Sequence, residues 1–467
     1  MIPSLPLFLF AVAGCALPRD SPPEVNFAHL DHLTERVALG SDTVSIVHIY
    51  ANYPEYRWVA AAESGPEGIA CVDDAARAAV VCLRSFELTG DRAGLERARG
   101  LLRFVMHMQA PDGEFNNFVR ADHTVNTTGR TSLKSFGWWA SRGLWAMALG
   151  ERAFRGIDPP FSRNLNERVS RMMPLLAASL KDYGSTRVVS GYTIPRWLLY
   201  ESGADVTSEL LLGLLEYRKS HDGDSLTSAI AKLAGGLVLM QDGQGNTPPY
   251  GLHRSWETLW HMWGNGQTQA LATAGLMLHD SVMTASAERE ARGWYARLLM
   301  EGFLKEYDVA RGGPPARFDQ IAYGVRPMAV GLIRLFEATG KREYLLMAGL
   351  AASWLTGNNA AGRAMYDPAS GRCFDGIRDS LTLNLNSGAE STIEALYTLV
   401  EVGRYPVAAG LLSCRKAAAG SNGEFAYAIF RSASGAEVTL ARNLAAGTLS
   451  VYEGTESEAF CRKERIP

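Results

Sequence analysis

One pattern constrains the fold of this chain more than any other: helical segments repeat from about residue 70 to about residue 420. In DDAARAAVVCLRSFEL and GLERARGLLRFVMHMQ, apolar residues recur at three- and four-residue spacing, as on one face of a helix. Pairs of helices form the repeating unit, and the first helices of the pairs begin near residues 73, 136, 204, 263, 321 and 388. Because helical repeats stack to bury their apolar faces, the six pairs predict an all-α, closed (α/α)6 toroid. An open solenoid is the alternative.

The links between these helices are unequal in length. A first helix joins its partner through a short turn, as at residues 89–91 and 339–342, where Gly90 and Gly340 end the helices. The links to the next pair are long, as at residues 110–135 and 242–262. Long loops in a compact domain are usually functional. In a toroid they would all lie at the N-terminal ends of the inner helices, and we expect the functional site there.

The two ends of the chain depart from the repeat. Residues 1–25 hold an apolar run that ends in VAGC and is too short to span a bilayer, which predicts a signal peptide with Cys15 as a lipidated residue. No Lys or Arg precedes this run, unlike an ordinary signal peptide. From the apolar run and VAGC we nevertheless expect an exported protein, either periplasmic or anchored to the outer membrane through Cys15 alone. Residues 26–420 would form the toroid catalytic domain, and residues 421–467, which alternate apolar and polar, a small β-rich appendage.

The overall charge and the known short motifs exclude several classes of protein. The formal net charge is −3 and the pI is near 6.3, so the sequence predicts no nucleic-acid partner. There is no C-x-x-C pair, H-E-x-x-H motif or phosphate-binding loop. We therefore expect neither a metal nor a cofactor.

Carboxylates and aromatic rings collect where the first helices begin. Seven of the ten tryptophans lie in the second, third and fourth of these openings. Flat rings beside carboxylates and amides suit a sugar, which has an apolar ring face and hydroxyl groups at its edge. The candidate catalytic residues are Asp73, Asp74, Glu209 and Glu390. The candidate substrate-binding residues are Arg77, Asn117, Trp138, Arg196, Trp256, Glu257, Trp260, Asn265, Asp319 and Tyr323.

Several of these residues also have a purely structural interpretation. Either Asp73 or Asp74 can cap its helix, because an Asp side chain accepts hydrogen bonds from free backbone N–H groups, and the other would then face the cavity. Ser387 and Glu390 match a capping box. The tryptophans could be core residues. Since neighbouring side chains diverge on a helix, we expect the partner of Asp73 or Asp74 to come from another hairpin.

Three segments within residues 65–150 resemble bacterial carbohydrate-associated proteins with a six-hairpin toroid of the glycosidase-like superfamily. EGIACVDDAARA, PDGEFNNFV and GWWASRGLWAMALGE are similar to D-D-N-A-R-A, D-G-x-F-x-N-F and G-R-A-L-W-A-L-G in those relatives, which are often described as glycosyltransferases through a fused domain. The later NSGAEST is similar too. Ala75 and Asn116 depart from the Asn and the frequent His of the relatives. The matching positions are Asp73, Asp74, Arg77, Asp112, Phe115, Asn117, Arg142 and Trp145.

The resemblance implies action on sugars without identifying the linkage. Hydrolysis of a glycosidic bond usually needs two carboxyl groups, so we expect an exported glycoside hydrolase acting on a polysaccharide or an oligosaccharide. A polysaccharide lyase or sugar epimerase on the same fold is the alternative, with Tyr323, His253 or His261 moving the proton and Arg196 or Arg254 binding a uronate. A surface lipoprotein that binds glycans without catalysis is the third possibility.

Overall fold

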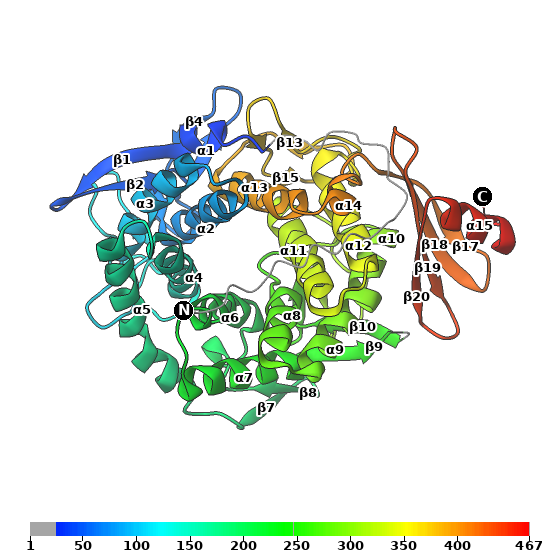
Figure 1. Ribbon diagram of the computed structural model, residues 1–467, viewed down its shortest axis with the longest axis horizontal. Coiled ribbons are helices and arrows are strands. Elements are labelled where there is room, and N and C mark those ends of the chain that lie inside the picture. Colours follow the sequence, from blue (N-terminus) through cyan, green and yellow to red (C-terminus); the bar gives the residue numbers. More distant parts are fainter. Residues whose placement is uncertain (1–24, 246, 467) are drawn as a thin grey trace.

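A computed structural model of the protein describes residues 25–245 and 247–466, so the predicted signal segment and Cys15 lie outside the described residues. Six inner helices form a closed ring, since each contacts the next and the last contacts the first (Figure 1). The prediction of an (α/α)6 toroid is therefore confirmed. In ring order the inner helices are α2 (Val72–Thr89), α4 (Trp138–Phe154), α6 (Ala204–Arg218), α8 (Gln267–Leu278), α11 (Ala322–Thr339) and α13 (Ala389–Gly403).

An outer helix follows each inner helix and packs against it. The predicted starts of the inner helices agree with the structure, and the largest difference is at α8, which was expected near residue 263 and begins at Gln267. No helix within the described ranges is both long enough and apolar enough to cross a membrane. The outer helices are α3 (Arg92–His107), α5 (Pro159–Ser179), α7 (Asp224–Leu239), α9 (Ser281–Glu290) continued through a π-helix (Ala291–Tyr295) into α10 (Ala296–Glu301), α12 (Glu343–Ala352) followed by a 3₁₀ turn (Ser353–Thr356), and α14 (Pro406–Ala409).

Local signals set some helix ends but not others. Helices α2 and α11 end at Gly90 and Gly340, whose φ angles of 71° and 70° lie in the left-handed region that glycine adopts freely. At the start of α2, Cys71 holds the capping position without a side-chain cap of its own, and the side-chain oxygen of Asn117 accepts the backbone N–H of Asp73. The expectation that Asp73 or Asp74 caps α2 is therefore wrong, and both carboxylates lie within the first turn.

The capping box expected at the start of α13 is also wrong. Gly388 occupies the capping position and has no side chain with which to cap the helix. The Ser387 hydroxyl instead lies 3.4 Å from the hydroxyl of Thr392, and Glu390 forms an ion pair with Arg77 of α2. Glu390 is thus turned toward the neighbouring inner helix and away from its own backbone.

The segment before the first hairpin contains strands that the sequence did not predict. Two antiparallel strands, in which Thr34 lies opposite Val47, pack on α3, and a second, shorter pair of strands follows them (Figure 1, blue). The last strand of this segment leads directly into α2. The elements are α1 (Ala28–Leu33), β1 (Thr34–Leu39), β2 (Asp42–Val47), β3 (Tyr50–Asn52), β4 (Arg57–Val59) and β5 (Ala70–Cys71).

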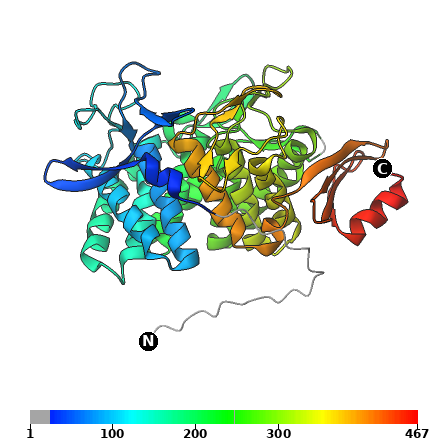
Figure 2. The ribbon, with the colours of Figure 1, turned by 90° about the horizontal axis from the view of Figure 1, so that it is seen from above.

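The long links between hairpins carry further short strands and gather on one side of the ring (Figure 2). Most pair within their own link, whereas β5 pairs with β6 and β11 with β12 across links. These strands are β6 (Phe118–Val119), β7 (Thr186–Val189), β8 (Tyr192–Pro195), β9 (Gln241–Gln244), β10 (Thr247–His253), β11 (Leu259–His261), β12 (Glu306–Asp308), β13 (Tyr366–Asp367), β14 (Arg372–Cys373), β15 (Gly376–Ile377) and β16 (Leu383–Asn384), and a 3₁₀ turn (Leu199–Glu201) precedes α6.

The C-terminal appendage is a four-stranded antiparallel sheet in sequence order, which confirms the expected small β element (Figure 1). It begins at Arg415 and is followed by a helix that the alternating pattern did not indicate. That helix covers one face of the sheet, where Phe460 packs against Tyr452. The elements are β17 (Arg415–Ser421), β18 (Phe425–Arg431), β19 (Glu437–Asn443), β20 (Leu449–Glu453) and α15 (Thr455–Glu464).

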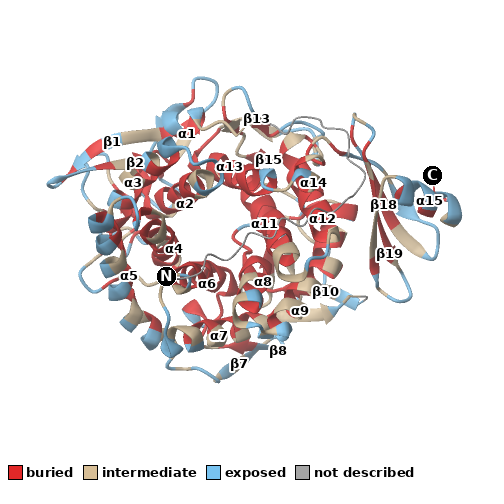
Figure 3. Ribbon diagram, viewed as in Figure 1, coloured by how far each residue is buried: buried red, intermediate tan, exposed pale blue. Residues whose placement is uncertain are grey.

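Charged side chains fill the interior of the ring, where the inner helices are almost wholly buried (Figure 3). Arg326 of α11 pairs with Glu209 of α6, and Arg84 of α2 pairs with Glu216 of α6. In both cases one inner helix lies between the two partners in the ring, so these ion pairs span its interior. Arg77 and Arg84 are two helical turns apart, as are Glu209 and Glu216. The interior is therefore built as layers of ion pairs.

Candidate active site

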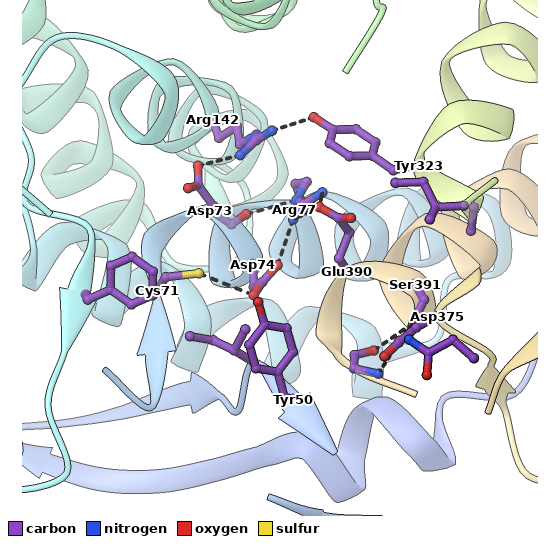
Figure 4. A pocket seen from close by; sticks show the side chains of 16 residues that line it. Tyr50, Cys71, Asp73, Asp74, Arg77, Arg142, Tyr323, Asp375, Glu390 and Ser391 are labelled. Atoms are coloured by element: carbon purple, nitrogen blue, oxygen red, sulfur yellow. Dashed lines mark hydrogen bonds and ion pairs between the residues drawn. The ribbon is translucent and has the colours of Figure 1, made fainter. Parts of the chain in front are cut away.

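A cavity of about 370 Å³ lies at the N-terminal ends of α2, α11 and α13, on the face where the long loops predict the site (Figure 4). Five of the predicted site residues line it: Asp73, Asp74, Arg77, Tyr323 and Glu390. The rest of the lining comes from α4, from the first turns of α11 and α13, from β3, β5, β6 and β16, and from the residues that lead into β3, α11 and α13. These residues are Ile49, Tyr50, Cys71, Phe118, Arg142, Ile321, Ala322, Asp375, Asn384, Gly388 and Ser391.

Arg77 gathers three carboxylates at the base of the cavity. Its guanidinium donates to Asp74 at 2.7 Å, to Glu394 at 3.0 Å and to Glu390 at 3.3 Å. The face of the guanidinium lies over Tyr323, 4.7 Å from the ring centroid, and the side chain is 5% exposed. Since Asp74 belongs to α2 and the two glutamates to α13, Arg77 joins the first and last inner helices and fixes the carboxyl groups between them.

Asp74 and Glu390 share this cation but differ in their access to the cavity. Asp74 is buried, and its second oxygen accepts a hydrogen bond from the Cys71 thiol at 3.2 Å. The Glu390 side chain is 46% exposed, and its Oε1 makes no hydrogen bond within the described residues. Burial raises the pKa of both carboxyl groups, and the charge of Arg77 opposes that rise. Glu390 is therefore a carboxyl group with one free oxygen and a tendency to hold its proton.

Asp73 is held in a different way. Its Oδ1 lies 2.6 Å from Arg142, and its Oδ2 accepts a hydrogen bond from the Asn117 amide at 3.0 Å. The Asn117 side-chain oxygen in turn accepts the Asp73 backbone N–H at 3.3 Å, and Arg142 also donates to the Tyr323 hydroxyl. The Asp73 side chain remains 17% exposed. Asn117, which was predicted to contact substrate, is itself buried and orients Asp73.

Glu209 lies beneath the cavity and does not line it. Its carboxylate is fully buried and accepts from the Tyr323 hydroxyl and from Arg326, each at 3.2 Å. Burial raises the pKa of Tyr323, so this hydroxyl stays protonated as a donor. The expectation that Glu209 acts on substrate is wrong, because its side chain has no exposed surface. It instead supports Tyr323 from below.

Two lining residues were not singled out from the sequence. Asp375 lies in the loop before α13, and its Oδ1 accepts from the Gly388 N–H at 2.7 Å and from the Ser391 hydroxyl at 2.6 Å. Burial raises the pKa of Asp375, although these two hydrogen bonds lower it. Tyr50, in β3, donates to Glu63 at 2.7 Å. No sequence pattern marks either residue, since each reaches the cavity through a loop or strand outside the helical repeat.

The predicted aromatic platforms have different positions. Trp138 is half-buried and does not belong to the cavity lining, but it packs against the lining residue Arg142, whose guanidinium lies 4.8 Å from its ring centroid, and Trp263 lies at 5.9 Å. Trp263 is 38% exposed, so these two rings offer a surface to a ligand. Trp256 is half-buried and does not line the cavity. Trp260 is 2% exposed and packs in the core, so its predicted role as a sugar platform is wrong.

The remaining predicted binding residues lie away from the cavity lining. Arg196 pairs with Glu201 at 3.1 Å, and Glu257 pairs with an arginine of β7 at 2.7 Å. Asp319 is exposed on the loop before α11. Asn265 is buried, and its side-chain oxygen has no hydrogen-bond partner among the described residues. The structure therefore does not bring these four residues into the lining.

Of the groups considered for a lyase or an epimerase, Tyr323 lines the cavity, whereas the two histidines and Arg254 are engaged elsewhere. His253 is fully buried, 2.7 Å from Glu290, and the buried Arg254 forms an ion pair in the β9–β10 region. His261 is buried and lies 2.9 Å from Asp205, with its ring stacked on Trp263. No histidine belongs to the described cavity lining.

Comparisons with known proteins identify the fold. No protein-family model and no curated protein sequence matches the chain. Among solved structures, the chain is similar to a sugar epimerase from a ruminal bacterium, with a TM-score of 0.54 at 12% identity, covering 81% of this chain and 95% of that one. For a cellobiose 2-epimerase from Bacillus thermoamylovorans the TM-score is 0.53 at 10% identity, with 80% and 95% covered. For a D-mannose isomerase it is 0.54 at 10% identity, with 77% and 91% covered.

These likenesses establish the architecture that the sequence predicted. The fold is the six-hairpin (α/α)6 toroid. At identities this low, the reaction has to be argued from the residues of the cavity.

Proposed function

We propose that the protein is a glycoside hydrolase that acts on a polysaccharide or an oligosaccharide by carboxyl general acid and base catalysis. The observation that carries the proposal is that two carboxyl groups with different surroundings, Glu390 and Asp73, line one cavity. Most glycoside hydrolases use such a pair, in which one group protonates the leaving oxygen and the other acts on water or on the sugar.

Glu390 is the general acid in this proposal. Burial raises its pKa, so the group keeps its proton to a higher pH than a solvated glutamate. Its Oε1 is free to donate to the glycosidic oxygen, while Oε2 remains against Arg77 at 3.3 Å. After the proton is transferred, Arg77 stabilises the carboxylate that results.

Asp73 is the base. The ion pair with Arg142 and the amide of Asn117 occupy one position on each carboxylate oxygen. A carboxylate oxygen has a second lone pair, so Asp73 can still accept a hydrogen bond from a water molecule in the cavity. Trp138 and Trp263 beside Arg142 supply the apolar surface for a sugar ring.

The experiment is release of reducing ends from a panel of glycans, with the products identified by mass spectrometry. We expect Glu390→Gln and Asp73→Asn each to lower kcat by about 10²–10⁴-fold, the usual contribution of a general acid or base. The matched control is Glu257→Gln, which removes a carboxylate that is outside the cavity lining and should leave kcat unchanged.

Two outcomes would contradict this proposal. If the wild-type protein binds glycans but releases no product, a binding protein without catalysis is the better description. If products form and both cavity variants keep the wild-type rate, the assigned carboxyl groups do not perform the reaction.

A sugar epimerase is the second candidate, because two of the three solved structures described above are named as epimerases and the third as a mannose isomerase. Tyr323 is the proton-transfer candidate that lines the cavity, whereas the pair formed by His261 and Asp205 lies beside Trp263 outside the lining. Epimerisation in D₂O places deuterium on a sugar carbon and releases no new reducing end. Hydrolysis gives the opposite result, so one NMR experiment separates the two reactions.

The proposed setting of the enzyme is the cell envelope, reached through residues 1–25 with a lipid on Cys15. Support comes from the apolar run that ends in VAGC. Fractionation with metabolic labelling by a fatty acid tests this, and Cys15→Ser should abolish the label. A wild-type protein found unlabelled in the cytoplasm would exclude it.

A further inference from the structure

Asp375 is the one carboxyl group of the described cavity lining that has no cation beside it. Asp73 pairs with Arg142, and Asp74 and Glu390 pair with Arg77. Asp375 makes its two hydrogen bonds through Oδ1 alone, to the backbone and side chain at the start of α13. Its Oδ2 has no hydrogen-bond partner within the described residues, and the residue lines the cavity (Figure 4).

The hydrogen bonds of Oδ1 have a structural explanation, because they cap α13 from outside the helix. Gly388 is the capping residue and supplies no side chain of its own. This explains why an oxygen is needed at that position. It does not explain why a second, charge-bearing oxygen lies open at the cavity, since a neutral amide would cap the helix equally well.

Both arginines in the lining are already committed to the protein's own groups. Arg77 contacts Asp74, Glu390 and Glu394. Arg142 contacts Asp73 and the Tyr323 hydroxyl, with its face over Trp138. An anionic sugar entering this cavity would therefore find no free cation in the described lining.

The charge of the lining is acidic. Four carboxyl groups face two guanidinium groups, and no lysine belongs to the described lining. A uronate would place its carboxylate against that of Asp375, and like charges brought together at an interface cost several kcal/mol. The arginines expected to bind a uronate, Arg196 and Arg254, are engaged outside the cavity.

Building on the hydrolase function, we propose that the cavity selects a glycan with a free amino group, an unacetylated hexosamine, whose ammonium is bound by Asp375. The ammonium supplies the positive charge that no residue of the described lining places beside this carboxyl group. A buried charge is stable only when it is paired, so the pairing favours the cationic sugar over a neutral one and over an anionic one.

The test is binding of three sugars of matched linkage, measured by calorimetry at about pH 6 and low salt: glucosamine, glucose and glucuronic acid disaccharides. We expect the glucosamine disaccharide to bind about tenfold more tightly than the glucose disaccharide, and glucuronic acid not to bind, as a single buried charge pair predicts. Asp375→Asn keeps an oxygen for the Gly388 N–H and removes the charge. It should abolish the preference for glucosamine while leaving the affinity for glucose within about twofold.

A second comparison needs no variant. N-acetylation of the glucosamine disaccharide removes its charge, so the wild-type protein should bind the acetylated sugar no better than glucose.

The inference and the hydrolase function fail separately. Equal binding of glucosamine and glucose, a preference that survives in Asp375→Asn, or tight binding of glucuronic acid would each overturn the inference. If the sugars bind in the expected order but no bond is cleaved, the hydrolase function fails and the selectivity stands.

Discussion

Replacing Arg77 with methionine is the most direct test of how the cavity is held together. The substitution keeps an unbranched, apolar stem of similar length and removes the charge. Asp74, Glu390 and Glu394 then lose their shared cation. Asp74 is 4% exposed and keeps no cation, so water cannot replace Arg77 there, whereas the buried Glu394 retains its ion pair with Arg326.

The expected loss follows from this burial. Breaking a buried ion pair by removing one partner costs about 3–5 kcal/mol, because the remaining charge is left without compensation. Unfolding entropy is about 2.1 cal/mol/K per residue, so a chain of 467 residues changes its Tm by about 1 °C per kcal/mol. We therefore expect Arg77→Met to lower the Tm by about 3–5 °C at neutral pH.

The dependence on pH gives the sharper test. Burial raises the pKa of Asp74 and of Glu390 while Arg77 lowers it, so the substitution raises both values further. At about pH 8 the variant must bury the unpaired carboxylate of Asp74, whereas at about pH 5 protonation removes part of that cost. The difference in Tm between wild type and variant should therefore be largest at high pH and shrink as the pH falls.

Thermal unfolding followed by circular dichroism at the two pH values measures this difference. The matched control is Arg97→Met, which breaks a partly exposed pair with Asp31 and should cost no more than about 1 kcal/mol. A Tm loss that does not depend on pH, or one no larger than in the Arg97 variant, would refute the argument that Arg77 compensates buried carboxylates.

Three further predictions concern the same site. In the wild-type enzyme, kcat should fall as the pH rises through the raised pKa of Glu390, because the general acid loses its proton, and Glu390→Gln should remove this basic limb from the residual pH profile. Trp138→Ala should raise KM several-fold with a small change in Tm, because the ring lies half-buried beside the cavity. Trp260→Ala should instead lower the Tm by about 3–5 °C, the cost of a large core cavity, and leave KM unchanged.

The architecture was predictable from local signals. Apolar periodicity indicated each inner helix, and Gly90 and Gly340 marked two helix ends, because only a residue without a Cβ adopts positive φ freely. The strands before α2 were missed. They stabilise one another by pairing and by packing on α3, and such contacts leave a weaker trace in a single sequence than helical periodicity does.

The site was predictable only in part. The aspartates of α2 and Glu390 were found because they lie at helix starts, where the topology places them on one face. Asp375 was not predicted, because it lies in a loop outside the helical repeat that guided the prediction. Trp260 was misplaced because a tryptophan in a link gives no sign of whether it faces the core or the cavity.

The spacing of charged residues on the inner helices is a further signal in the sequence. Arg77 and Arg84 on α2, and Glu394 and Glu401 on α13, are spaced by two helical turns within otherwise apolar helices. A charge at each second turn of a buried helix predicts a polar partner on the facing helix, since an unpaired charge is too costly to bury. Reading these stripes together predicts that the interior of the ring is filled by ion pairs.

The ion pairs also explain how a ring of helices can present unpaired carboxyl oxygens at one end. Below the cavity, Arg326 neutralises Glu394 and Glu209, and Arg77 in the next layer completes the neutralisation of Glu394. Each layer thus shares its cations with the layer above, until the last layer ends at the cavity. There Glu390 accepts hydrogen bonds from Arg77 through Oε2 alone, and its Oε1 remains free. The cavity is therefore acidic because the layers of ion pairs end there. A ligand with positive or hydrogen-bond-donating groups can pair with the free carboxyl oxygens.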